Sequence, residues 1–147
     1  MELKIEAHLC KLPVITSIIW IVPISYCYGK GIHHPACYVL LILILNMSIF
    51  SCLFWIDPVA HRNSIFHCLD AFFARMTIII FILYNLIFQI ENTPFFTSMG
   101  TMTVFFYFSN YYSGRLWCCA SHIFCHLCAH LFATLGIYHT LAFIENK

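Results

Sequence analysis

The feature that most constrains this chain is an apolar run long enough to cross a membrane. Residues 36–56, ACYVLLILILNMSIFSCLFWI, carry no charged side chain, and Asp57 and Pro58 end the run. A hydrocarbon core about 30 Å thick is crossed by about 20 helical residues. The whole chain is 62% hydrophobic and 9% charged, whereas soluble domains carry about 25% charged residues. We therefore predict an all-α integral membrane protein.

Turn-forming and charged residues divide the chain into five apolar segments of helical length. The predicted spans are residues 12–28, 36–56, 64–89, 97–112 and 116–142. Pro23 predicts a kink in the first segment, because proline removes a helical hydrogen bond and its ring clashes with the preceding turn. If the first segment does not cross, four spans remain. Both counts predict one polytopic transmembrane helix bundle over residues 1–147, without a separate soluble domain.

Charge and cysteine usage exclude several classes of protein. The formal net charge of +1 provides no basic surface for nucleic acid, and the sequence has no phosphate-binding glycine loop. Most of the nine cysteines lie in apolar runs, which is typical of small buried side chains rather than of a secreted disulfide framework. We expect membrane lipid, and not nucleic acid, to surround and contact this chain.

The lysines and arginines outside the spans favour one orientation. With five spans, four of these residues lie on the side of the N-terminus and two lie on the other side. The first group is Lys4, Lys11, Arg62 and Arg115, and the second is Lys30 and Lys147. Because positive charges concentrate in cytoplasmic loops, the sequence favours a multi-pass protein whose N-terminus faces the cytoplasm.

A few polar side chains interrupt the apolar spans at helical spacing. His67 and Asp70 lie three residues apart and share one helix face, whereas Arg75 is expected to point elsewhere. The last span contains His122, His126 and His130 at four-residue intervals, which keeps all three within about 80° of one face. The sequence thus predicts one polar stripe on each of two helices.

The two stripes are expected to meet, because spans 64–89 and 116–142 run in the same direction from the same face of the membrane. At about 1.5 Å per residue, Asp70 lies about 10 Å along its helix, and His122 and His126 lie about 10 and 16 Å along theirs. Ser51, close to the end of span 36–56, reaches a similar depth. One layer is therefore predicted to contain Ser51, His67, Asp70, His122 and His126.

The chemistry of that layer suggests a metal site. A carboxylate facing lipid costs about 2.5–3.5 kcal/mol, so Asp70 is expected to face the bundle and to have a partner: a histidine, Arg75 or a bound cation. Imidazole and carboxylate groups are the ligands of catalytic zinc, which activates water for attack on an amide or ester. The predicted metal ligands are His67, His122, His126 and His130, with Asp70 and Ser51 as catalytic residues.

A serine near the end of one span, an aspartate early in the next and an H-x3-H pair in the last span resemble the CREST superfamily of membrane hydrolases, which includes alkaline ceramidases and adiponectin-type receptors. The resemblance implies a zinc-dependent lipid amidase or esterase. It assigns catalysis to Ser51 and Asp70, and metal ligation either to His122 with His126 or to His126 with His130. This sequence departs from the family in having Trp55 where the first motif has histidine, and fewer than seven spans.

Other interpretations of the same residues remain open. Neutral histidines hydrogen-bond between membrane helices without any metal, and two histidines from different helices are also able to ligate a heme iron. The alternative to an enzyme is a non-catalytic membrane subunit or anchor of a larger complex, adjacent to heme or quinone. Its partner would be a second copy of the chain or another membrane protein. The enzyme requires a lipid substrate and a route for it into the site.

Overall fold

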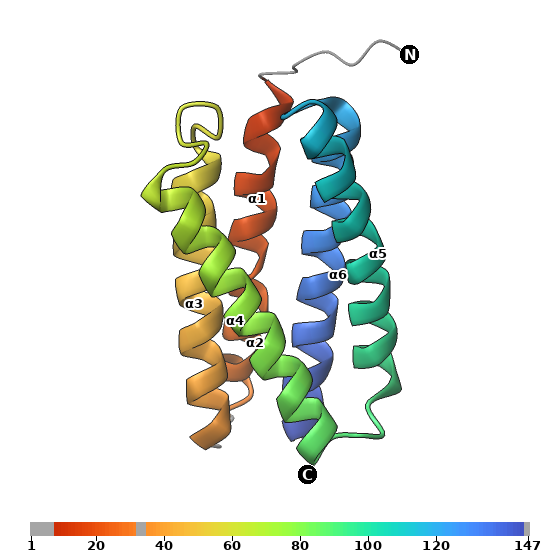
Figure 1. Cartoon of the computed structure of the whole chain (residues 1–147). Helices are drawn as coiled ribbons and strands as arrows, with labels where there is room; N and C mark the ends of the chain where they lie inside the picture. The colour runs from red at the N-terminus through yellow and green to blue at the C-terminus, as the bar shows by residue number, and fades with distance from the viewer. Residues whose placement is uncertain (1–7, 32–34, 146–147) are drawn as a thin grey trace.

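The computed structural model describes residues 8–31 and 35–145. It is 84% helical and the described part contains no strand, which confirms the predicted all-α bundle. Figure 1 shows the helices running up and down beside one another. The elements are η1 (Leu9–Lys11), α1 (Leu12–Ile19), α2 (Ile21–Gly29), α3 (Pro35–Trp55), α4 (Ile65–Phe88), α5 (Thr93–Arg115) and α6 (Ala120–Glu145).

Four stretches of the described chain are long and apolar enough to cross a membrane, namely Leu9–Gly29, Pro35–Trp55, Ile65–Phe88 and Ala120–Ile144. The first segment, whose crossing the sequence left open, is among them. Its helix is interrupted at Trp20, between α1 and α2. Pro23 explains the interruption, because it has no N–H to donate to the carbonyl of Ile19 four residues earlier.

Helix α5 is longer than the sequence predicted and less apolar than the other four. It begins four residues before the expected start at residue 97, because the Asn92 side chain accepts a hydrogen bond from the Phe95 N–H and Pro94 lies in the first turn. Some of its hydroxyls bond to carbonyls of its own helix, at 3.0 Å for Thr101 and 2.8 Å for Thr103. These bonds leave fewer polar groups without a partner along an apolar bundle.

The helices pack as two pairs. Helix α5 lies along α6, and α4 lies along α3, while α1 contacts both α3 and α6. Helix α4 touches α6 only slightly, and it crosses the bundle obliquely in Figure 1. The pairs are thus joined mainly through α1, which leaves the side between α4 and α5 less tightly closed.

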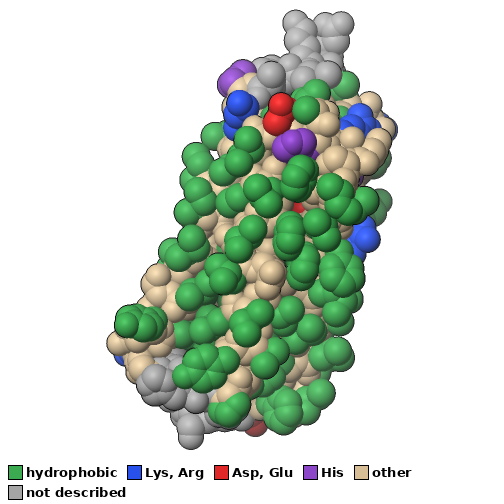
Figure 2. All heavy atoms as spheres, turned by 90° about the vertical axis from the view of Figure 1, so that its left-hand side faces the viewer, with side chains coloured by type: hydrophobic (Ala, Val, Ile, Leu, Met, Phe, Trp, Pro, Cys, Tyr) green, Lys and Arg blue, Asp and Glu red, His purple; other side chains and the backbone are tan. Residues whose placement is uncertain are grey.

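The outer surface suits a lipid environment. Figure 2 shows hydrophobic side chains covering the face formed around α3 and α4, with most of the visible charged side chains near one end. Large apolar residues such as Ile42, at 60% exposure, and Leu83, at 50%, point outward. An apolar belt between more polar ends is the pattern expected of a membrane-spanning bundle.

At the end of the bundle opposite η1, a fully buried set of amides and one hydroxyl joins the ends of α4, α5 and α6. The Asn85 amide donates to Thr140 Oγ1 at 2.7 Å, and the Asn92 amide donates to Asn85 Oδ1 at 3.0 Å and to the His139 carbonyl at 3.2 Å. Gln89 donates to the Thr140 carbonyl at 3.3 Å. We call Asn85, Gln89, Asn92 and Thr140 the amide clasp; the sequence analysis did not predict it.

Candidate functional site

A cleft of about 370 Å³ opens between α4 and α5 and reaches inward to α6 and α3. This volume lies within the usual range of ligand pockets, about 300–1,000 Å³. Polar side chains line the part nearer the start of α4 and α6, and mainly apolar ones line the deeper part. The first group includes His67, Asp70, Ser113, His122 and His126, and the second includes Met47, Ile78, Ile79, Met102 and Ala133.

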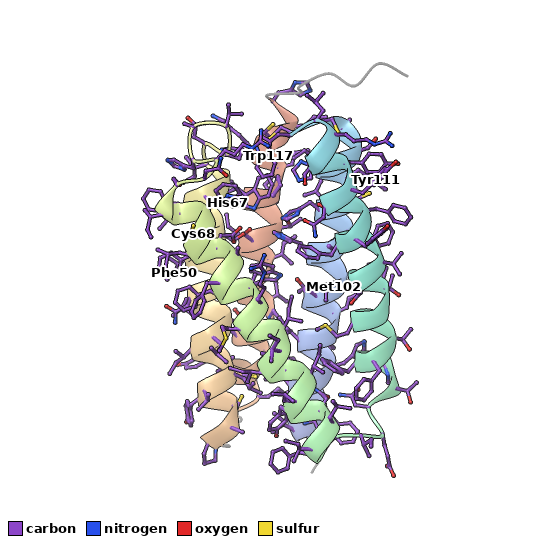
Figure 3. The ribbon with its side chains drawn as sticks, in the orientation of Figure 1. Phe50, His67, Cys68, Met102, Tyr111 and Trp117 are labelled. Carbon is purple, nitrogen blue, oxygen red and sulfur yellow. The ribbon has the colours of Figure 1, made fainter. Side chains whose placement is uncertain are left out.

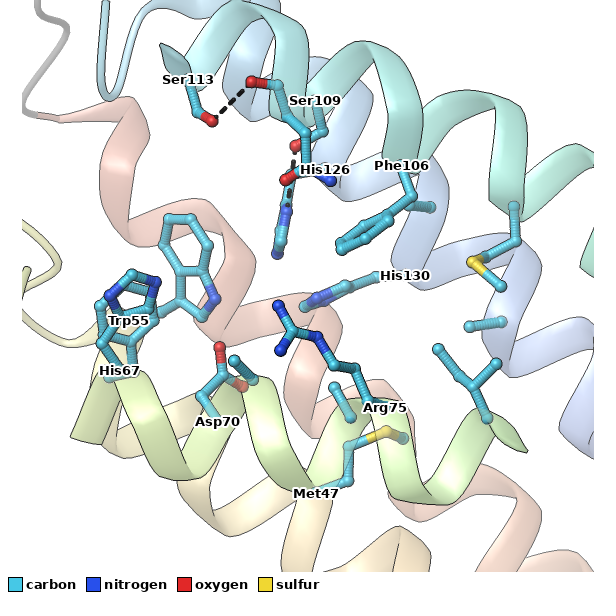
Figure 4. Close-up of a pocket in the computed structure, with 18 of the residues that line it drawn as sticks. Met47, Trp55, His67, Asp70, Arg75, Phe106, Ser109, Ser113, His126 and His130 are labelled. Carbon is cyan, nitrogen blue, oxygen red and sulfur yellow. Dashed lines mark hydrogen bonds between the residues drawn. The ribbon is translucent and has the colours of Figure 1, made fainter. Parts of the chain in front are cut away.

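Asp70 is half-buried and is supported from behind by a chain of hydroxyl groups. Its carboxylate accepts a hydrogen bond from the Ser51 hydroxyl, and the Ser17 hydroxyl donates to Ser51 Oγ at 2.8 Å. Ser51 has 0% exposure and is not among the residues that line the cleft. Ser51 therefore positions the carboxylate, and the carboxylate faces the cleft (Figure 4).

The hydrogen bonds of His130 define its tautomer. Thr16 Oγ1 donates to the Pro13 carbonyl at 3.0 Å, and it lies 2.8 Å from His130 Nδ1. With the hydroxyl proton of Thr16 directed to the Pro13 carbonyl, the Thr16 oxygen accepts from Nδ1–H. A neutral imidazole with a proton on Nδ1 has a lone pair on Nε2, so Nε2 of His130 is a base.

His67 and His122 have the opposite tautomer, and the same local motif fixes both. The backbone N–H of Asn63 donates to His67 Nδ1 at 3.3 Å, and that of Cys118 donates to His122 Nδ1 at 3.1 Å. In each case the donor has a positive φ, 63° at Asn63 and 60° at Cys118, and lies four residues before the histidine at the start of a helix. With Nδ1 accepting, the neutral ring carries its proton on Nε2 and acts as a donor.

Two buried ring nitrogens near the middle of the site have no hydrogen-bond partner in the described part of the chain. They are Nε2 of His126 and Nε1 of Trp55, on rings whose centroids are 4.6 Å apart. His126 Nδ1 lies 3.2 Å from Ser109 Oγ, a hydroxyl able either to donate or to accept. Buried polar groups are nearly always paired in native proteins, so orphaned ones suggest an absent ligand or water.

Two of the four predicted zinc ligands, His67 and His122, have no free ring nitrogen in this structure. A ligating nitrogen must offer a lone pair, whereas the neutral rings of His67 and His122 carry a proton on Nε2 because Nδ1 accepts from the backbone. His126 and His130 lie close together, with ring centroids 4.5 Å apart. Over residues 8–31 and 35–145, no group of three His, Cys, Asp or Glu side chains is arranged to hold a metal ion. Zinc stays a prediction from the sequence.

The predicted alternative of a heme held between helices meets a packing obstacle. The histidines available from two different helices are His67 on α4 and the stripe on α6. Trp117 fills the space between them, with its ring centroid 5.8 Å from that of His67 and 4.9 Å from that of His122. Figure 3 shows His67 and Trp117 directed toward one another near the upper end of the bundle. An axial pair from these helices would require Trp117 to move.

The expectation that Arg75 points away from the polar stripe is wrong. Arg75 lines the same cleft as Asp70, and Figure 4 shows its guanidinium extending toward the space between Asp70 and His130. Spacing along the helix gives the direction of Cβ, but a long side chain leans toward the N-terminus of its helix. The Arg75 side chain therefore enters the cleft, although its Cα lies on a different face of the helix from that of Asp70.

Of the residues selected from the sequence, His67, Asp70, His122, His126 and His130 line one cleft, and Ser51 lies behind Asp70. Besides Arg75, the structure adds Trp55, Trp117 and Ser109. Trp55 stood out in the sequence as a departure from a family motif, and its indole faces the same space (Figure 4). The other additions had no sequence signal, because serine and tryptophan are common in membrane helices.

These features define a helical integral membrane protein with a polar site reached from the side of the bundle. No family model matches the sequence, and the searches found no matching curated protein or solved structure. The resemblance to CREST hydrolases therefore stays a prediction from a few motif residues.

Proposed function

We propose that this protein is an integral-membrane hydrolase that cleaves an ester or amide of a lipid entering sideways between α4 and α5. One observation carries the proposal: the cleft has an apolar part and a polar part. The polar part contains acid–base side chains, and the ring nitrogens His126 Nε2 and Trp55 Nε1 there have no hydrogen-bond partner among the described residues. A lipid has the same two parts in one molecule. The polar part also lies where His130, His126 and Asp70 come together.

The histidines supply complementary proton-transfer groups. Nε2 of His130 accepts a proton from a water molecule, and the water oxygen then bonds to the carbonyl carbon of the lipid. The carbonyl oxygen gains negative charge, which N–H donors at His122 Nε2 and Trp55 Nε1 stabilise. When the carbon–oxygen or carbon–nitrogen bond of the leaving group breaks, that group receives the proton.

The test is fatty-acid release from defined lipids by the purified protein in detergent, measured by mass spectrometry. The substrates are a ceramide, a diacylglycerol and a phosphatidylcholine. We expect release to fall about 100-fold or more in His130→Gln, because general acid–base groups contribute about 10²–10⁴-fold. His139→Gln, a histidine of α6 that does not line the cleft, is the matched control. Equal release by wild type and His130→Gln would exclude the proposed base.

The metal content of the same samples tests the zinc prediction. One zinc per chain by elemental analysis, lost in His126→Ala, would show that the histidines rearrange to bind metal and would replace the mechanism above. An absorption spectrum of the purified protein tests the heme alternative in the same way.

A second candidate is a non-catalytic lipid-binding subunit of a membrane complex. The observation that favours it is the apolar part of the cleft, with side chains such as Met47 and Ile78, because such a surface holds a lipid chain whether or not any bond is cleaved. Retention of lipid without release of fatty acid would establish this candidate over the enzyme.

A further inference from the structure

We propose that the cleft binds a zwitterionic phospholipid, with the phosphate at Arg75 and the ammonium group at Asp70. This inference rests on the proposed function only in taking the cleft as the entry site of a lipid. It assigns the class of lipid, which the proposed reaction leaves open.

Arg75 is an exceptional charge in this chain. Within Pro35–Trp55, Ile65–Phe88 and Ala120–Ile144, which the structure describes completely, it is the one lysine or arginine, and Asp70 is the one acidic residue. A charge within a membrane-spanning helix is costly, and such residues normally pair with one another or mark a binding site. Arg75 and Asp70 both line the cleft, so the cost is concentrated in one place.

The two charges do not satisfy each other. Asp70 takes its hydrogen bond from Ser51, and no ion pair joins it to Arg75 within the described chain. Figure 4 shows the carboxylate and the guanidinium facing a common space, with the rings of Trp55 and His130 around it. A site with one free positive and one free negative group is complementary to a ligand that carries both charges.

The order of groups along the cleft matches the order of groups in a glycerophospholipid. Within α4, Asp70 lies five residues and Arg75 ten residues from the start, which separates their Cα atoms by about 7.5 Å at 1.5 Å per residue, and the Arg75 side chain leans back toward Asp70 (Figure 4). Ile78 and Ile79 follow at greater depth. From the membrane face inward, a zwitterionic phospholipid presents an ammonium group, a phosphate, an acyl ester and a hydrocarbon chain.

The proposed base also lies at the required depth. His130 lines the same cleft as Arg75, and Figure 4 shows its ring beside the Arg75 guanidinium. An acyl ester next to the phosphate would therefore lie near His130 Nε2. Arg75 binds a phosphate oxygen pair through its planar guanidinium, which presents parallel N–H donors.

Lipid retention in detergent, measured by native mass spectrometry, tests the assignment. The three probes have the same chains: dioleoyl phosphatidylcholine, dioleoyl phosphatidylglycerol and dioleoylglycerol. We expect the wild type to retain phosphatidylcholine about tenfold better than dioleoylglycerol, a difference of about 1.4 kcal/mol. Arg75→Gln should abolish that preference, and Asp70→Asn should abolish only the preference for phosphatidylcholine over phosphatidylglycerol.

Two further variants keep the test decisive. Arg75→Lys retains the charge and should keep most of the preference for phosphate, which separates lost recognition from lost folding. Arg115→Gln removes an arginine that lies over the Tyr111 ring, with 4.4 Å between its Cζ and the ring centroid, outside the cleft, and should change nothing. Equal retention of all three lipids by the wild type, or unchanged preference in Arg75→Gln, would overturn the proposal.

The experiment tests the phospholipid site and the hydrolase activity independently. If phosphatidylcholine is retained through Arg75 but no fatty acid is released, the phospholipid site stands and the hydrolase does not. If dioleoylglycerol is cleaved equally by wild type and Arg75→Gln, the hydrolase stands and the phospholipid assignment is wrong.

Discussion

At one end of the bundle the amide clasp pairs its buried side-chain groups with one another. At the other end, Asp70 and the histidines face a cleft, and two buried ring nitrogens have no partner within the described residues. Both sets are polar, both lie within apolar helices, and both connect α4 to α6 or α5. They differ in whether the protein itself satisfies them.

The difference separates stability from binding. A buried hydrogen bond with both partners in place stabilises a fold, whereas an unpaired buried group costs free energy until a ligand or water satisfies it. The clasp is therefore expected to hold the helices together. The unpaired groups of the cleft are expected to lower the stability of the fold slightly until a ligand binds to them.

The largest expected effect is on lipid handling by the cleft. Asp70→Asn should reduce fatty-acid release from phosphatidylcholine about 10–100-fold, because a hydrogen bond to a charged group contributes about 1.5–3 kcal/mol. The free energy of unfolding, measured by denaturant titration in micelles, should not fall, since the variant loses no ion pair. Asp57→Asn, in the exposed turn where Asp57 Oδ1 accepts from the Ala60 N–H, is the control. A large loss of stability in Asp70→Asn would place Asp70 with the clasp residues.

Asn85→Ala should have the converse effect. It removes the hydrogen bonds that join Asn85 to Thr140 and to Asn92, so we expect a loss of about 1–2 kcal/mol in the free energy of unfolding, near the upper end for polar pairs in membranes. Lipid release per folded molecule should stay the same. Asn46→Ala removes an exposed amide that bonds only to its own helix, at 2.8 Å from the Ile42 carbonyl, and should have little effect. Similar losses in both variants would contradict the clasp.

The smallest effect tests how tightly the α5–α6 pair is packed. A Cβ on Gly136 would lie 2.6 Å from Met99 Cε, whereas a Cβ on Gly100 would meet nothing within 4 Å. Gly136→Ala should cost about 1 kcal/mol, since the flexible methionine is able to shift, and Gly100→Ala should stabilise α5 by about 0.5–1 kcal/mol through helix propensity. If both changes stabilise, α5 and α6 are less tightly packed than the structure has them.

Helical periodicity was enough to find five of the polar side chains that line the cleft. The four-residue spacing of His122, His126 and His130 fixed one face of α6, and the shared direction of α4 and α6 brought Asp70 to that face. The failure at Arg75 has a simple cause, because periodicity describes where a side chain starts and not how far it extends. The amide clasp was missed because its members lie on two helices and a loop, with no common spacing.

The sequence by itself determined that this is a membrane-spanning helical bundle, since the lengths of its apolar runs match the thickness of a bilayer. It also determined the interruption of the first helix before Pro23, because proline lacks the N–H that a continuous helix needs. Tertiary structure decided the rest: that Ser51 lies behind Asp70, that α4 and α5 leave a cleft, and that the histidines differ in tautomer. These features depend on contacts between helices. The spacing of residues within a single helix does not determine which helices pair or at what angle they cross.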